Sequence, residues 1–122
     1  MTRDEVDSWL ERYVSAWKSN DPAEIGELFS EGASYRYWPG DEPKVGREAI
    51  VEAWLGEGDE PGTFDASYSC WALDGDRAVA TGTSTYTAPE QRVYHNVFLL
   101  VFDEDGRCAD FSEVYIKQPS GA

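Results

Sequence analysis

Positively charged residues are scarce in this sequence. Only ten Lys and Arg stand against 24 Asp and Glu, which gives a formal net charge of −14 at pH 7. An acidic surface of this strength repels phosphate backbones and anionic lipid headgroups. We therefore expect neither nucleic acid nor a membrane surface to be a partner.

Cysteines, long apolar runs and cofactor motifs are also few or missing. Cys70 and Cys108 lack CxxC spacing and neighbouring histidines, which argues against a zinc or redox site and predicts free buried thiols. No run of about 18 apolar residues occurs, and the first residues, MTRDEVDSWLERY, do not resemble a signal peptide, so we expect a cytoplasmic protein. The GxGxxG, P-loop, HExxH and nucleophile-elbow motifs are absent, so no nucleotide cofactor and no metal is expected.

Aromatic residues, in contrast, are abundant. The chain of 122 residues contains five Trp, seven Tyr and five Phe, and large aromatics line either a core or a concave ligand pocket. A chain of this length forms one domain with one core. We expect a single domain over residues 1–122 with a short tail at 118–122.

Apolar residues recur at helical spacing three times in the first half of the chain. Thr2 and Glu5 have the spacing of a capping box, which predicts the start of a long first helix. Asp21 followed by Pro22 predicts the start of a short second helix, whose apolar stripe extends to the end of DPAEIGELF. The run GREAIVEAWL predicts a third helix over residues 46–55.

The second half of the chain alternates with a period of two, which is typical of strands. Turn-forming segments DGD, APEQ and DEDG separate four such runs, and these cover residues 63–73, 76–87, 92–102 and 107–117. Helices followed by consecutive antiparallel strands predict an α+β domain in which the helices cover one face of a sheet.

The run VYHNVFLLVF predicts a strand that is apolar on both faces. One face carries Tyr94, Phe98, Leu100 and Phe102, and the other carries Val93, Val97, Leu99 and Val101. A strand of this kind is buried on both sides. The helices can cover only one face, so we expect a homodimer through the other. His95 lies on that outer face, which favours an interface or surface role over catalysis.

The last strand, RCADFSEVY, places a carboxylate between two aromatic residues on one face. If DEDG is the loop of the final hairpin, three pairs share that face: Tyr94 with Tyr115, Asn96 with Glu113, and Phe98 with Phe111. Burial in such surroundings raises the pKa of a carboxyl group toward the range useful for acid–base chemistry, unless hydrogen bonds restore it. The Asn96 amide and tyrosine hydroxyls can supply such bonds. Glu113 is therefore either a proton-transfer group or a structural carboxylate.

The runs ERYVSAWKSNDPAEIGELFSEGASYRYWPG and VGREAI, with the hairpin FDEDGR, resemble the nuclear transport factor 2-like superfamily, in its SnoaL-like and ketosteroid isomerase-like branch. This resemblance implies a cone-shaped domain. In it, a curved antiparallel sheet wraps around a long N-terminal helix, with two shorter helices and an open apolar pocket. Many members are dimers through the sheet. The fold hosts isomerases, dehydratases, cyclases, hydrolases and non-catalytic modules, so it decides no chemistry by itself.

Most of the steroid isomerase pattern does not carry over. Tyr13 matches the isomerase's oxyanion tyrosine, and Trp54 stands where a supporting tyrosine would be. Tyr37 and Phe98 replace its two aspartates, so a steroid isomerase of the known kind is not expected. The resemblance and the strand alternation together imply a pocket lined by Tyr13, Trp17, Phe29, Tyr37, Trp54, Tyr94, Asn96, Phe98, Phe111, Glu113 and Tyr115.

Two functional hypotheses follow. The first is a pocket protein for a small apolar or aromatic molecule, working as a cofactor-free isomerase, dehydratase or cyclase. In it Glu113 moves a proton, Tyr13 and Tyr37 donate hydrogen bonds to an oxyanion, and Asn96 orients the carboxylate. A hydrolase that activates water between Glu113 and Asn96 would use the same residues.

The second hypothesis is a non-catalytic dimeric module for ligand binding or protein association. The loss of both isomerase aspartates favours it, and it predicts a cavity filled by Trp17, Tyr37 and Trp54.

Overall fold

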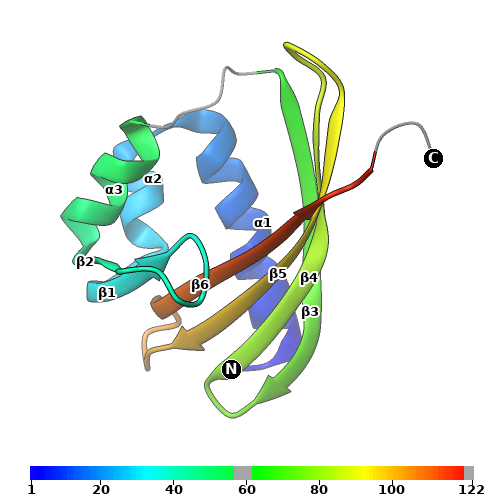
Figure 1. Cartoon of the computed structure of the whole chain (residues 1–122). Helices are drawn as coiled ribbons and strands as arrows, with labels where there is room; N and C mark the ends of the chain where they lie inside the picture. The colour runs from blue at the N-terminus through cyan, green and yellow to red at the C-terminus, as the bar shows by residue number, and fades with distance from the viewer. Residues whose placement is uncertain (57–61, 120–122) are drawn as a thin grey trace.

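The structure is a computed structural model that describes residues 1–56 and 62–119, so the last three residues of the tail expected at 118–122 lie outside the described residues. Its architecture is α+β, as the sequence predicts (Figure 1). The elements are α1 (Arg3–Ser19), α2 (Pro22–Glu27), β1 (Phe29–Arg36), β2 (Lys44–Val45), α3 (Arg47–Gly56), β3 (Phe64–Asp74), β4 (Arg77–Tyr86), β5 (Arg92–Phe102) and β6 (Cys108–Lys117).

The helix starts follow from their capping residues. Thr2 Oγ1 accepts a hydrogen bond from the Glu5 amide at 3.1 Å, and Glu5 Oε1 accepts one from the Thr2 amide at 2.9 Å, which completes the capping box of α1. Asp21 caps α2 in the same way through the Ala23 amide. The second helix ends earlier than its apolar stripe suggests, because Phe29 already begins β1.

The strands form one sheet in the order β2-β1-β6-β5-β4-β3. The four strands from β3 to β6 are consecutive and antiparallel, as predicted. β1 joins the far side of β6 in parallel, and the short β2 extends that edge in antiparallel orientation. This non-local pairing of β1 is a feature that the local sequence pattern does not contain.

The predicted register between β5 and β6 is wrong by two residues. Phe98 faces Glu113 and Asn96 faces Tyr115, in place of the expected pairs. One residue of the shift comes from a longer hairpin loop, since Phe102 faces Cys108. The other comes from an irregularity at Ala109, because the next pair is Val101 with Asp110. From Asp110 onward the shift is two residues, which keeps these side chains on their predicted faces, whereas Cys108, shifted by one, turns to the inner face with Phe102.

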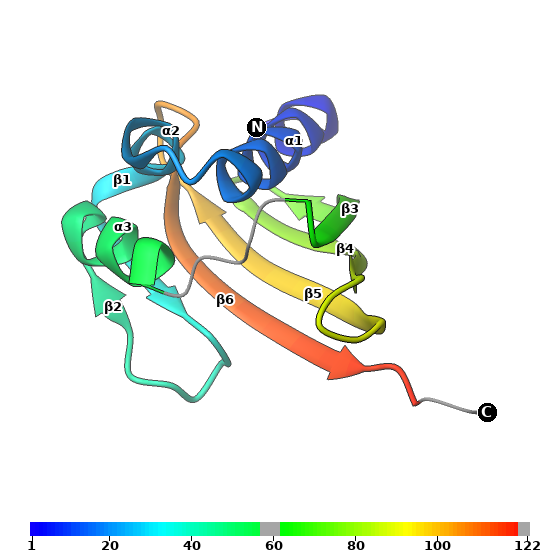
Figure 2. The same cartoon turned by 90° about the horizontal axis from the view of Figure 1, so that it is seen from above.

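The sheet curves around the helices and leaves its concave face toward them (Figure 2). α1 packs along β3, and its fully buried Trp9 donates an indole hydrogen bond to the Leu28 carbonyl at 2.9 Å. Phe98 and Phe111 join Trp9 in the core at 1% and 0% exposure. The two thiols are free, as expected, although only Cys108 is fully buried and Cys70 is half-buried.

The convex face of the sheet carries apolar side chains that the single chain leaves uncovered. Leu99 is 42% exposed and Trp71 is 68% exposed, while Val97 and Val101 are half-buried. His95 lies on the same exposed side and contacts Gln118, as its alternation predicts. The second subunit expected to cover this face remains a prediction.

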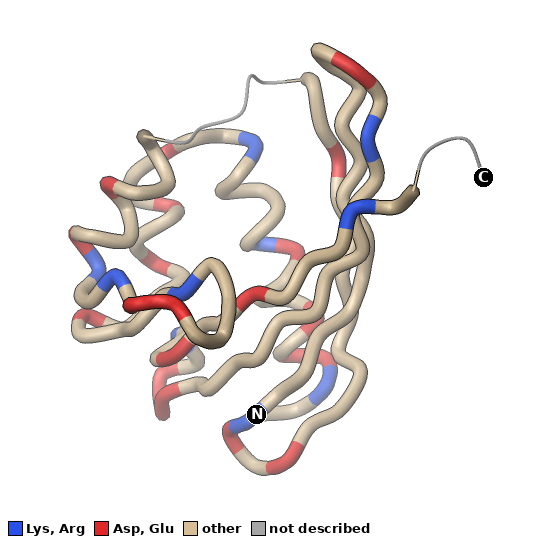
Figure 3. The backbone as a smooth tube through the Cα atoms, viewed as in Figure 1, with Lys and Arg blue, Asp and Glu red and all other residues tan. Residues whose placement is uncertain are grey.

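Acidic residues are distributed over the helices and the loops, with fewer basic ones between them (Figure 3). Within the described residues, no helix is long and apolar enough to cross a membrane. The cytoplasmic location expected from the sequence remains a prediction.

Candidate active site

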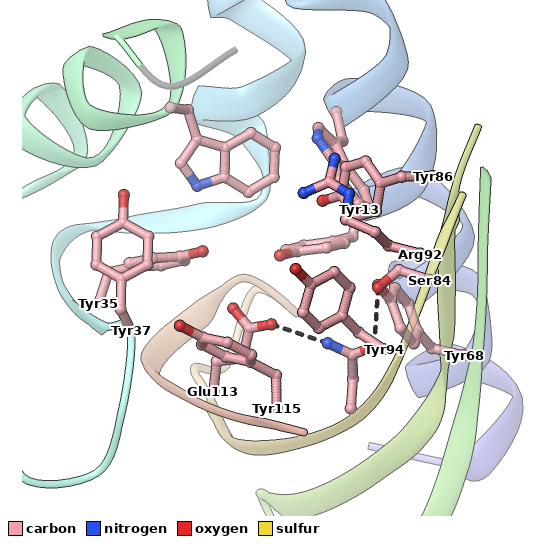
Figure 4. Close-up of a pocket in the computed structure, with 13 residues that line it drawn as sticks. Tyr13, Tyr35, Tyr37, Tyr68, Ser84, Tyr86, Arg92, Tyr94, Glu113 and Tyr115 are labelled. Atoms are coloured by element: carbon pink, nitrogen blue, oxygen red, sulfur yellow. Dashed lines mark hydrogen bonds between the residues drawn. The ribbon is translucent and has the colours of Figure 1, made fainter. Parts of the chain in front are cut away.

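A cavity of about 300 Å³ lies on the concave side of the sheet, between the strands, α1 and α3 (Figure 4). Its wall is mostly aromatic, with a small number of polar groups among the rings. The lining residues are Tyr13, Trp17, Tyr35, Tyr37, Trp54, Tyr68, Ser84, Tyr86, Arg92, Tyr94, Asn96, Glu113 and Tyr115. This size and composition are typical of a small-molecule pocket.

Glu113 is held by a chain of polar side chains across three strands. Asn96 on β5 donates a hydrogen bond from Nδ2 to Glu113 Oε2 at 2.9 Å. Ser84 on β4 donates in turn to Asn96 Oδ1 at 3.1 Å, which fixes the orientation of the amide (Figure 4). Ser84 and Asn96 are 3% and 5% exposed, so these two hydrogen bonds are shielded from water.

The pKa of Glu113 is raised from the ordinary 4.5 to about 7. Burial is the larger cause, because the ionised form loses its hydration among aromatic rings. The Asn96 hydrogen bond lowers the pKa but offsets only part of this effect. The carboxyl group is thus divided between its two protonation states near neutral pH, as a proton-transfer group requires.

Two buried tyrosines stand next to this carboxyl group. Tyr13 and Tyr35 are 7% and 4% exposed, and the pKa of each lies well above 10. Burial is the main cause for both, and the negative charge of Glu113 raises both further. Both hydroxyls therefore stay protonated and act as hydrogen-bond donors.

Core aromatics fix the rings of these two tyrosines. Phe111 stacks on Tyr35 with ring centroids 4.5 Å apart and on Tyr13 with centroids 5.6 Å apart. Phe98 contacts Tyr13 and Phe111 from the adjacent strand. The tyrosine rings are therefore held by packing below the cavity rather than by loops.

Two further donors complete this wall. The pKa of Tyr68 is raised, chiefly by burial, while its contact with Ser84 lowers it in part and the charge of Glu113 raises it. Trp54 packs edge-on against Tyr13 at 5.0 Å. Its Nε1 is buried and forms no hydrogen bond within the described residues. It lies near the Tyr35 hydroxyl and lowers the pKa of Tyr35 in small part.

The structure brings together most of the residues that the sequence singles out. The cavity wall contains Tyr13, Trp17, Tyr37, Trp54, Tyr94, Asn96, Glu113 and Tyr115. The expectation that Phe29, Phe98 and Phe111 also line it is wrong, because all three are buried in the core and are not among the lining residues. Strand alternation gives the face of a residue but not its depth along the curved sheet.

Five lining residues were not among the predicted ones: Tyr35, Tyr68, Ser84, Tyr86 and Arg92. The alternation of ASYRYW could have identified Tyr35, since it shares a face with Tyr37. Tyr68 and Ser84 could have been found only with the pairing of β3 with β4 and β5 in hand. Arg92 could have been identified by the alternation of the run at 92–102, since it shares a face with Tyr94 and Asn96.

A curved sheet that encloses a small-molecule cavity against three helices defines the nuclear transport factor 2-like class of pocket domains. Residues 10–111 match the model of the SnoaL-like domain, so the chain belongs to the SnoaL-like family.

One solved structure with this fold is an NTF-2-like protein of unknown function from Burkholderia xenovorans LB400. It is 14% identical, covers 96% of this chain and 89% of its own, and superposes with a TM-score of 0.70. No curated protein matches the sequence.

Proposed function

We propose that this protein is a cofactor-free enzyme that transfers a proton on a small, largely apolar or aromatic carbonyl compound. The observation that carries the proposal is Glu113, a carboxyl group with a pKa of about 7 in a tyrosine-lined cavity of about 300 Å³. Perturbed carboxyl groups in clefts mark catalytic acids and bases. The family supplies the pocket but leaves the chemistry open.

The proposed step uses each polar group in one role. The Glu113 carboxylate removes a proton from the carbon next to the carbonyl, and the electron pair moves onto the carbonyl oxygen. The protonated hydroxyls of Tyr13 and Tyr35 donate to that oxygen, with Tyr37 beside them at 5.3 Å from the Tyr35 ring. Glu113 then returns the proton to another carbon, or a leaving hydroxyl group takes it and departs as water. Asn96 orients the carboxylate throughout.

The non-catalytic alternative predicts a cavity filled by its own aromatic side chains. A volume of about 300 Å³ leaves room for a small ligand beside Trp17, Tyr37 and Trp54. In a purely structural carboxylate, hydrogen bonds would outweigh burial and lower the pKa, whereas the Asn96 bond offsets only part of the burial and the pKa of Glu113 is raised. Both observations favour the enzyme over the module.

The test is hydrogen–deuterium exchange of 2-tetralone, an aromatic ketone with exchangeable protons beside its carbonyl, followed by proton NMR in D₂O. The wild type should accelerate exchange over buffer, with a rate that rises with pH around 7 as Glu113 ionises. Glu113→Gln should lose about 100-fold or more of this acceleration. Glu104→Gln, which removes an exposed carboxylate in the β5–β6 loop, is the matched control and should behave as the wild type.

Equal exchange rates for the wild type and Glu113→Gln would remove Glu113 from the reaction and favour the non-catalytic module. A circular dichroism spectrum and a melting curve for each variant establish that the comparison is between folded proteins.

We also propose that the protein is a homodimer through the convex face of the sheet. The support is the apolar surface of β5 and β3, where Leu99 and Trp71 are 42% and 68% exposed in the single chain. A twofold axis across this face would cover both copies at once, because such an interface uses the same surface twice.

A further inference from the structure

Arg92 is a cation in the wall of the candidate active site that no acceptor among the described residues satisfies. It is the first residue of β5, opposite Tyr86 on β4. Its guanidinium lies 4.5 Å from the centre of the Tyr86 ring and points into the cavity (Figure 4). Within the described residues, its Nε is buried without a hydrogen-bond partner, and the guanidinium makes no ion pair.

The other half-buried arginines are all matched by an acceptor. Arg36 bonds the Asp110 carboxylate at 2.7 Å. Arg47 donates to the Phe29 carbonyl at 2.9 Å. Arg107 bonds Glu27 at 3.0 Å. Among the half-buried arginines, Arg92 is the one whose guanidinium forms no hydrogen bond within residues 1–56 and 62–119.

The Tyr86 ring attracts the positive charge of Arg92 but does not supply the hydrogen-bond acceptors that its guanidinium needs. A guanidinium over a tyrosine face is attracted to the ring, but its N–H groups still need acceptors. The cavity wall contains tyrosine hydroxyls that could accept from it, but within the described residues no hydrogen bond joins any of them to Arg92. Within residues 1–56 and 62–119 the guanidinium therefore keeps N–H groups that a ligand or water can satisfy.

Glu113 does not fill this role. The two side chains form no ion pair, and no cation contributes to the pKa of Glu113, which an adjacent arginine would lower. Figure 4 shows the Glu113 carboxyl group turned toward Asn96, while the guanidinium of Arg92 lies over the Tyr86 ring. A ligand in the cavity can thus meet a cation with one part and the proton-transfer group with another.

We infer that the ligand is an aromatic or apolar carboxylate whose carboxylate group pairs with Arg92 while its ring system lies among the tyrosines. A single guanidinium matches a single negative charge, and its planar fork fits a carboxylate through two parallel hydrogen bonds. A doubly charged phosphate would bring an uncompensated charge near Glu113. That Glu113 acts on the other end of this ligand rests on the proposed function.

The test compares 2-naphthoate with its neutral analogue 2-naphthamide by isothermal titration calorimetry at about pH 6, where most Glu113 is protonated. The wild type should bind 2-naphthoate about tenfold more tightly or better, since a charge-assisted pair in a shielded site is worth this much. Arg92→Met should abolish the preference at similar side-chain length, and Arg92→Lys should keep part of it. Arg12→Met, on the exposed side of α1, is the control for the loss of one positive charge.

Equal affinities of the wild type for the two compounds, no detectable binding of 2-naphthoate, or an unchanged preference in Arg92→Met would each overturn the carboxylate site. Glu113→Gln should keep the preference for 2-naphthoate because it leaves Arg92 in place. A wild type that prefers 2-naphthoate but does not accelerate 2-tetralone exchange therefore refutes only the acid–base function. A wild type that accelerates 2-tetralone exchange but binds 2-naphthoate and 2-naphthamide equally refutes only the role of Arg92.

Discussion

Replacing Glu113 by Gln should make the protein more stable at neutral pH and change how its stability depends on pH. Gln has the shape of Glu and its side-chain oxygen still accepts the hydrogen bond from Asn96 Nδ2, which is 2.9 Å in the wild type. The substitution thus removes the charge and leaves the packing and the polar chain to Ser84 intact. The difference between the two proteins reports the cost of ionising this one group.

The magnitude follows from the raised pKa. The unfolded chain releases the Glu113 proton near pH 4.5, whereas the native state holds it up to about pH 7. Between these values the native state binds more protons than the unfolded state, so the free energy of unfolding falls as pH rises. One pKa unit corresponds to about 1.4 kcal/mol. Ionised Glu113 therefore costs the wild type about 3 kcal/mol above pH 7, a cost that is absent below pH 4.5.

The assay is urea unfolding of the wild type and Glu113→Gln at several pH values from about 5 to 8. The free-energy difference should move in favour of the mutant across this range and level off above about pH 7. Glu104→Gln controls for the loss of one negative charge. Parallel curves for the wild type and Glu113→Gln, or a mutant that weakens as pH rises, would refute the reasoning, since Glu113 would then be exposed or stabilised as an anion.

Three further predictions concern the hydrogen bonds of Glu113, the packing of β3 against β4, and the proposed dimer. Asn96→Leu should raise the pKa of Glu113 above its wild-type value and cost about 1–3 kcal/mol in urea unfolding, because the Ser84 hydroxyl loses its acceptor; an unchanged pKa would contradict this. Gly82→Ala should reduce the free energy of unfolding by about 3 kcal/mol or more, because the new Cβ would lie 2.0 Å from the Ser67 carbonyl oxygen. A lower melting temperature would show this. Gly32→Ala, with open space at its Cβ, is the matched control. Leu99→Glu should convert a dimer into a monomer in sedimentation velocity, and a monomeric wild type would refute the proposed interface.

The amino-acid sequence predicts the helix starts and the faces of the strands well, because local rules determine both. The Thr2 capping box depends on neighbours within one turn. The inward orientation of Glu113 survives a register error because the error is an even number of residues. The register itself depends on the loop length and the irregularity at Ala109, which the alternation pattern does not specify.

Features that depend on distant parts of the chain were beyond local reasoning. Phe98 and Phe111 face the right side of the sheet, but α1 and β1 close over them, so they support the cavity from below. Tyr35 approaches Glu113 only because β1 pairs in parallel with β6. Alternation places Arg92 on the inward face of β5, but its position over the Tyr86 ring depends on the pairing of β5 with β4.

The most direct test of the central claim is the titration of Glu113 by carboxyl carbon-13 NMR in uniformly labelled protein, with Glu113→Gln to assign the resonance. We predict a midpoint at about pH 7, displaced upward from 4.5 by burial among the aromatic rings. A midpoint close to 4.5 would show that Glu113 is ionised at neutral pH and well solvated or hydrogen-bonded, and would contradict its role as a proton-transfer group poised near neutrality.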